Sequence, residues 1–189
     1  MNSILKPLAA LIEKNDQVKS LSFRNMGLNA IPVDLSRFPK LEHLDLSGNQ
    51  FSVLPEQLCS LKKLKSINLS GNFRLNWSRS LLVLLDCPKL ETLNISYNGL
   101  EELPAELLHF DQLKKLVLDG NKLDAFSNRS LMNTPENVEV ISACHCQNGE
   151  FGTRVKNLPS LRQVVVNDFD YEELMRLHWR KPEVEVILL

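Results

Sequence analysis

A nine-residue pattern recurs along almost the whole chain and constrains its fold more than any other feature. The template is apolar-x-x-apolar-x-apolar-x-x-Asn, and its copies begin 23 to 26 residues apart. The segments 41–49 (LEHLDLSGN) and 113–121 (LKKLVLDGN) are two full copies. A fixed period of this length indicates a solenoid, in which short units stack because none buries its apolar side alone. The eight copies begin at Val18, Leu41, Leu64, Leu90, Leu113, Val138, Leu161 and Val184.

Three units continue with an apolar residue and a proline, at Ile31-Pro32, Leu54-Pro55 and Leu103-Pro104. The template with this ending resembles the leucine-rich-repeat family, in particular its 23-residue intracellular type with units of the form LxxLxLxxNxLxxLPxxLxxL. The resemblance covers nearly the whole chain. It implies an α/β solenoid: a curved parallel β-sheet of about eight strands, a helical or irregular convex side and a helical N-terminal cap.

Each template position has an expected direction. The first, fourth and sixth positions should point into the core, and the third and fifth should project from the concave face of the sheet, because successive residues of a strand alternate. The second position alternates in charge from unit to unit, which favours a row of ion pairs along one sheet margin. The resemblance implies that the template asparagine bonds backbone groups in the turns and stacks as a ladder. Asn49, Asn72, Asn98 and Asn121 hold that position.

The template fails at both ends, which predicts capping units within one continuous domain. Residues 1–17 should form an amphipathic helix over the first repeat, and the repeats should fill 18–169. In 170–189, Asp170 can cap a helix that reaches about Trp179, and Val184, Ile187 and Leu189 supply a last strand. A sheet that ends on a strand leaves an open edge, which is a route to self-association.

Composition and cysteine usage indicate which compartment and which kinds of partner suit the chain. The formal net charge is −1 with no basic cluster, so the chain lacks the surface that tracks phosphates in nucleic acid. No apolar run approaches the ~18 residues that span a bilayer. There are 4 cysteines without the paired flanking pattern of a secreted repeat protein, and two potential glycosylation sites, Asn68 and Asn94, fall in expected strands. These features favour a cytoplasmic protein with no nucleic-acid or membrane partner.

The concave face changes character along the chain. In the first four units its residues are polar and mostly small, and from the fifth unit most are aliphatic. A contiguous apolar patch on a solvated face typically marks a protein interface. The alternative is that valine merely suits a strand, or that the terminal helix covers the patch. The predicted partner-binding residues are Lys115, Val117, Val140, Ser142, Gln163, Val165, Val186 and Leu188, with Tyr97 and His145 as the rim.

The fourth interval, from Leu64 to Leu90, holds three extra residues around Trp77. Tryptophan is a favoured interface anchor. The leucines that follow, however, read as a helical return limb that would absorb Trp77 into the core, and this interpretation is preferred.

The segment Cys144-His145-Cys146 is the one place with the residue types of a metal or catalytic site. Alternate side chains of a strand-turn diverge, and no second ligand pair follows, so a zinc site is not expected. A nucleophilic cysteine also needs its histidine within hydrogen-bond reach, which sequence neighbours rarely achieve. We therefore expect neither a cofactor nor a metal.

The sequence predicts a non-enzymatic protein–protein interaction module, an adaptor or regulatory scaffold that binds a protein through the C-terminal half of its concave face. Two alternatives stay open at this stage. One is a secreted bacterial effector of the same repeat type that binds a host protein. The other is an enzyme that uses Cys144, His145 and Cys146.

Overall fold

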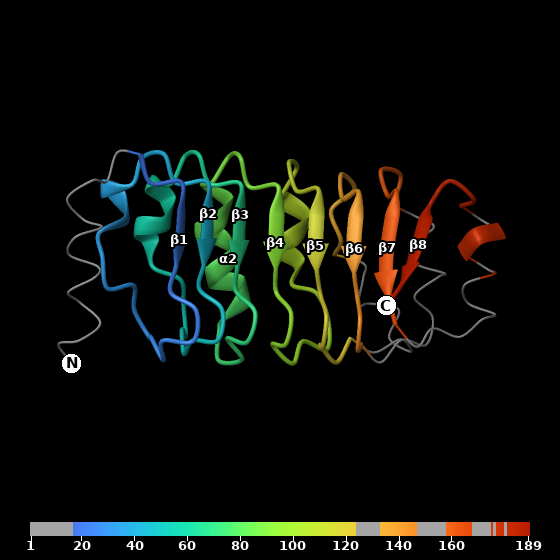
Figure 1. The fold of residues 1–189 in the computed structure, drawn as a ribbon, viewed down its shortest axis with the longest axis horizontal. Coiled ribbons are helices and arrows are strands. Elements are labelled where there is room, and N and C mark those ends of the chain that lie inside the picture. Colours follow the sequence, from blue (N-terminus) through green and yellow to red (C-terminus); the bar gives the residue numbers. More distant parts are fainter. Residues whose placement is uncertain (1–16, 124–132, 147–157, 168–174, 176, 180) are drawn as a thin grey trace.

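A computed structural model of the 189-residue chain describes residues 17–123, 133–146, 158–167, 175, 177–179 and 181–189. Eight strands in this part of the chain form one open parallel sheet whose spatial order follows the sequence (Figure 1). The expected solenoid with about eight parallel strands is therefore confirmed. The strands are β1 Ser20–Ser22, β2 His43–Asp45, β3 Ser66–Asn68, β4 Thr92–Asn94, β5 Lys115–Val117, β6 Val140–Ser142, β7 Gln163–Val166 and β8 Glu185–Leu188.

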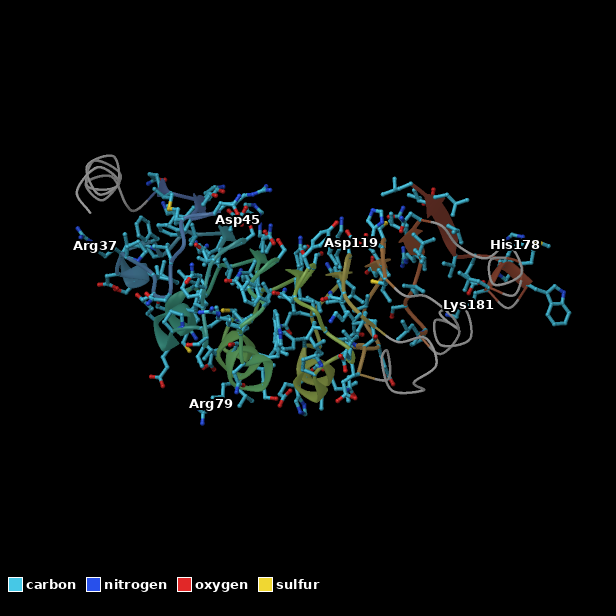
Figure 2. All side chains as sticks on the ribbon, turned by 90° about the horizontal axis from the view of Figure 1, so that it is seen from below. Arg37, Asp45, Arg79, Asp119, His178 and Lys181 are labelled. Atoms are coloured by element: carbon cyan, nitrogen blue, oxygen red, sulfur yellow. The ribbon has the colours of Figure 1, made fainter. Side chains whose placement is uncertain are left out.

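The return limbs carry short helices on the convex side of the curved sheet, opposite Asp45 and Asp119 (Figure 2). Three of them are short 3₁₀ helices of three to five residues, whereas the longer fourth interval forms a true α-helix. Its N-cap is Asn76, whose side chain accepts a 3.0 Å hydrogen bond from Arg79 N. Trp77 is half-buried and packs against the core, as the preferred interpretation predicted. The helices are η2 Leu35–Arg37, η3 Glu56–Ser60, α2 Trp77–Leu85 and η4 Ala105–His109.

The core lies between the sheet and these limbs. In units two to seven, the first, fourth and sixth template residues are all buried, so the expected inward positions are confirmed. The turn residues Phe51 and Leu123 are buried as well. Stacked units thus share one continuous apolar core, which no unit could form alone.

The asparagine ladder is present in the middle of the stack. Asn98 illustrates its geometry: Nδ2 donates to Ile95 O at 2.9 Å and, in the preceding unit, to Leu69 O at 3.2 Å. Its Oδ1 accepts from Asn72 N at 2.6 Å. Each amide therefore ties its own turn to the turn before it and satisfies buried backbone groups. Asn49, Asn72, Asn98 and Asn121 are all buried and donate in the same way.

The charged row at the second template position forms ion pairs in the first half of the stack. Glu42 lies between two lysines, with Lys19 Nζ at 3.2 Å and Lys65 Nζ at 2.5 Å. Lys114 Nζ lies 3.2 Å from Glu91. Hydrogen bonds from Lys65 and Lys19 lower the pKa of Glu42 to about 2.

The last strand departs from the sequence-based register. The template places Val186 opposite Gln163, but the observed pairs are Gln163 with Glu185 and Val164 with Val186. A slip of one residue exchanges the two faces of a strand. Val186 therefore packs against the core, and the prediction that Val186 and Leu188 project from the concave face is wrong.

The slip begins within the first residues of β8. Val184 keeps the template turn, since its N–H donates to Lys181 O at 3.1 Å. Glu185 N still donates to Arg162 O at 2.8 Å, as second-position residues do in the preceding units, so the slip falls after this bond. A single neighbour does not by itself shift the register, because β1 pairs with β2 alone and keeps the template pairing.

The predicted caps are only partly visible. Residues 1–16 of the expected N-terminal helix and Asp170 lie outside the described residues. Near the C-terminus, Met175 and residues 177–179 are helical, and Lys181 N donates to Leu177 O at 2.8 Å. These residues form a helical turn directly before β8, which we call the cap helix.

Candidate protein-binding face

The concave face consists of two parallel rows of side chains, set by the strand register. The row at the third template position runs Ser20, His43, Ser66, Thr92, Lys115, Val140, Gln163 and Glu185. The row at the fifth position runs Ser22, Asp45, Asn68, Asn94, Val117, Ser142, Val165 and Ile187.

A shallow groove of about 420 Å³ runs along this face from β1 to β5, where it ends at Lys115 and Val117. Its fifth-row side chains are largely committed to their own turns. Asp45, Asn68 and Asn94 each accept a hydrogen bond from the backbone N–H two residues on, at 2.9, 3.0 and 2.9 Å. Their polarity therefore has a structural cause, because an Asx turn closes the end of each strand. Sequence reasoning missed this role, although the Asp/Asn-x-Ser spacing signals it.

The C-terminal half presents an aliphatic patch, which we define as Val117, Val140, Val165 and Ile187. All four side chains are half-buried on the concave face. Lys115 and Glu185, both exposed, stand at opposite ends of the third-position row beside it. The structure thus brings together five of the predicted binding residues, and the slip replaces Val186 and Leu188 with Ile187. The five are Lys115, Val117, Val140, Gln163 and Val165.

Ser142 occupies the predicted place but is only 8% exposed. Its hydroxyl donates to Asp119 Oδ1 at 2.7 Å, and Cys144 N donates to the same oxygen at 2.9 Å. Asp119 therefore caps the end of β6, which belongs to the next unit. In the first half of the stack, each cap lies within its own unit. Ser142 supports the patch from within and offers little surface to a partner.

The two predicted rim residues share an unusual backbone conformation. Tyr97 and His145 have φ of 54° and 55° at the template position where the second, third and fifth units have Gly48, Gly71 and Gly120, and Asn25 of the first unit has the same conformation. The 58% exposed Tyr97 ring covers Gly120, since a Cβ there would lie 2.3 Å from ring carbons. His145 is exposed, and its Nδ1 lies 2.8 Å from Asn167 Nδ2. Left-handed backbone costs a non-glycine residue of order 1 kcal/mol, so both side chains are held on the turns by their surroundings.

The cysteine segment has the geometry of a structural element. Cys146 stands at the ladder position, and its Sγ donates to Leu118 O at 3.3 Å. Burial raises the pKa of Cys146 to about 11, and burial also raises the pKa of Cys144. Thiols that hold their protons are poor nucleophiles. Among the described residues no three potential metal ligands gather.

Comparison with known proteins agrees with this architecture. A leucine-rich-repeat family model matches residues 16–73, and a second leucine-rich-repeat model matches residues 89–110. These matches identify leucine-rich repeats over residues 16–73 and 89–110, and the eight-stranded parallel sheet continues the same repeat architecture along the described stack. No curated protein matches the sequence.

Two solved structures share the fold. A leucine-rich-repeat protein of Leptospira interrogans is 22% identical with a TM-score of 0.62, over 96% of this chain and 51% of that one. A chain of the mouse RP105/MD-1 complex is 20% identical with a TM-score of 0.57, over 79% of this chain and 25% of that one. This chain therefore spans about half the length of the first and a quarter of the second.

A repeat scaffold of this class typically binds proteins and lacks enzymatic activity. In the described part of the chain, every helix is too short or too polar to cross a bilayer.

Proposed function

We propose that this protein is an adaptor or regulatory scaffold that holds a protein partner against the C-terminal half of its concave face. The aliphatic patch carries the proposal. Its four side chains occupy neighbouring strands of a face that is polar in the other half. The four side chains are half-buried, so part of each is open to a partner, and a contiguous apolar patch on a protein surface often marks an interface.

Polar groups around the patch would give orientation to the contact. Lys115 and Glu185 place opposite charges on two sides of it, and Tyr97 offers a large exposed ring on the turns. Charged groups at the margin of an apolar contact steer the partner and fix its register. Aromatic rings held in one conformation bind at low entropic cost.

The surroundings of the cysteines support cytoplasmic residence as part of this proposal. The chain has free thiols at Cys59, Cys87, Cys144 and Cys146. Glycans on Asn68 and Asn94 would lie on the concave sheet, where Asn68 lines the groove. A reducing compartment without glycosylation suits both features. Fluorescence imaging of the tagged full chain would test it.

The partner is sought by affinity capture with paired variants. Val140→Glu/Val165→Glu places two carboxylates in the patch, and Ser20→Glu/Thr92→Glu places two in the polar half as a matched control. Both must keep the wild-type circular dichroism spectrum and unfolding transition. We expect a captured protein to be retained by the wild type and the control, and to bind the patch variant at least ~10-fold more weakly.

The same comparison distinguishes the alternatives. Equal loss in both double variants would mean that charge anywhere on the face disrupts binding. Retention by all three baits would move the site away from the concave face.

A further inference from the structure

Helix α2 is the longest helix among the described residues, and one of its faces is open to solvent along its whole length. The helix lies on the convex side, where Arg79 points away from the sheet (Figure 2). At 3.6 residues per turn, residues three or four positions apart share a face of a helix. The outward face of α2 therefore carries Ser78, Arg79, Leu82 and Asp86, and all four are exposed.

The two charges on this face oppose the dipole of their own helix. Arg79 lies in the first turn, at the positive end of the dipole, and Asp86 is the C-cap residue, at the negative end. They cannot pair with each other, because seven positions place them ~10 Å apart along the axis. Among the described residues, neither takes part in an ion pair. Near Asp86, Lys62 Nζ donates to the main-chain oxygen at 3.0 Å, and the neutral Cys59 thiol bonds the carboxylate. The helix alone gives no reason for these two charges.

An apolar side chain lies between the charges. Leu82 is 55% exposed at the centre of the face. On η4, which packs beside α2, Leu108 is 46% exposed. The solvated face of a surface helix is usually polar. An apolar centre with a charged margin is instead the composition of a protein interface.

We propose that a second copy of this chain packs its α2 antiparallel against this one, about a twofold axis that passes between Leu82 and Val83. The axis lies midway between Arg79 and Asp86, so Arg79 of each copy meets the partner subunit's Asp86. Both ion pairs form on the same flank of the contact, because the rotation reverses the helix direction and keeps the flanks in place. Leu82 meets the partner subunit's Leu82 at the centre. Each charge also comes to lie beside the end of the other helix that favours it.

The face is complementary to itself in this orientation. A parallel pair of helices, about a twofold axis along them, would bring Arg79 against the partner subunit's Arg79 and would join the two carboxylates of Asp86. Like charges opposite each other disfavour that arrangement. The antiparallel contact is isologous and stops at two copies. One helix pair and a few side chains bury less than ~1,200 Å², which is the range of transient association. We expect a dissociation constant on the order of 100 µM.

Charge reversal tests the pairing of Arg79 with Asp86. Arg79→Glu and Asp86→Lys each place like charges at both pairs, so each should weaken dimerisation at least ~10-fold. Both remove a charge that opposes the helix dipole, so the unfolding transition should not fall. Lys122→Glu lies on the turns, changes the net charge as Arg79→Glu does, and should dimerise as the wild type does. Sedimentation equilibrium from ~1 µM to ~1 mM measures the dissociation constants.

A mixture of the two single variants tests the twofold symmetry. In the mixture, the introduced glutamate of one chain meets the introduced lysine of the other, and native Asp86 meets native Arg79. We expect a heterodimer with about the wild-type affinity, detected by sedimentation velocity with one variant fluorescently labelled. The double variant Arg79→Glu/Asp86→Lys inverts both pairs and should dimerise again. A mixture that stays monomeric would overturn the twofold pairing.

Leu82→Ala tests the apolar centre of the contact. Both residues are good helix formers, so α2 should persist, and dimerisation should weaken at least ~10-fold. Met26→Ala shortens an exposed apolar side chain on a turn and is the matched control. A wild type that remains monomeric at ~1 mM would refute the dimer, as would unchanged dimerisation of Leu82→Ala or of either charge variant. The inference does not rest on the proposed function, since Val140→Glu/Val165→Glu should dimerise as the wild type does.

Discussion

The two halves of this solenoid share one repeat but differ in the chemistry of their turns and in the side chains on their concave face. From β2 to β5, a buried asparagine holds each turn, and Asx caps close most of the strands. From β6 onward, a thiol replaces the asparagine at Cys146, and Asp119 closes a strand of the next unit. The concave face is polar from β1 to β4, and the aliphatic patch begins at Val117 on β5. The turn of that unit still holds the ladder residue Asn121, so the surface changes one unit before the turn chemistry does, and the two vary independently along the stack.

The largest effect expected from this contrast is on stability at the ladder position. Asn98→Ala removes donors to Ile95 O and Leu69 O and the acceptor for Asn72 N, all buried. Unpaired buried groups cost 1–3 kcal/mol each, so we expect a loss of about 4 kcal/mol in the free energy of unfolding. Cys146→Ala removes one weak S–H donor and should cost about 1 kcal/mol.

Urea denaturation monitored by circular dichroism measures both values. Asn121→Ala is a suitable second variant, since Asn121 makes the equivalent bonds to Leu118 O and Ile95 O. If Cys146→Ala destabilised the chain as much as Asn98→Ala, the thiol would be a full member of the ladder. The two halves would then differ only in the side chains on their concave face.

Most of the fold follows from the sequence because its determinants are local and repeated. A buried leucine, a turn glycine and an asparagine recur at fixed offsets, and each copy confirms the others. The aliphatic character of Val117, Val140 and Val165 was predictable for the same reason, since alternation along a strand decides which residues share a face.

The errors concern interactions between units or at the ends of the stack. The slip of β8 shifts the strand pairing by one residue although the template spacing is unchanged, so the template does not encode it. The burial of Ser142 depends on Asp119 in the preceding unit. Both arise from contacts between residues more than twenty positions apart, at places where the repeat departs from its own pattern. Asx capping, in contrast, was readable from the Asp/Asn-x-Ser spacing.

A second prediction tests the slipped register and has a smaller effect. Val186 packs against the core and Ile187 faces the concave side. Val186→Asp should lower the free energy of unfolding by about 1–2 kcal/mol, because a half-buried apolar contact is replaced by a charge. Ile187→Asp should change it by less than about 0.5 kcal/mol. The template register predicts the opposite order, so thermal or urea unfolding of the pair decides between the two registers.

The smallest effect concerns the charged row and depends on pH. The pKa of Glu42 is lowered to about 2 by hydrogen bonds from Lys65 and Lys19. A carboxylate with a depressed folded-state pKa stabilises the fold above its unfolded value near 4.5, and this contribution is lost as the pH falls through about 2. The stability difference between the wild type and Glu42→Gln should therefore be constant above about pH 5 and shrink toward pH 2. Because these side chains are solvated, added salt should reduce the difference at neutral pH.

In the second half, Glu185 faces Gln163, whose Nε2 donates to its carboxylate at 2.7 Å. The change in stability caused by Glu185→Gln should therefore depend little on salt. If it depended on salt as strongly as the change caused by Glu42→Gln, Glu185 would still belong to the charged row, and the slipped register would be wrong.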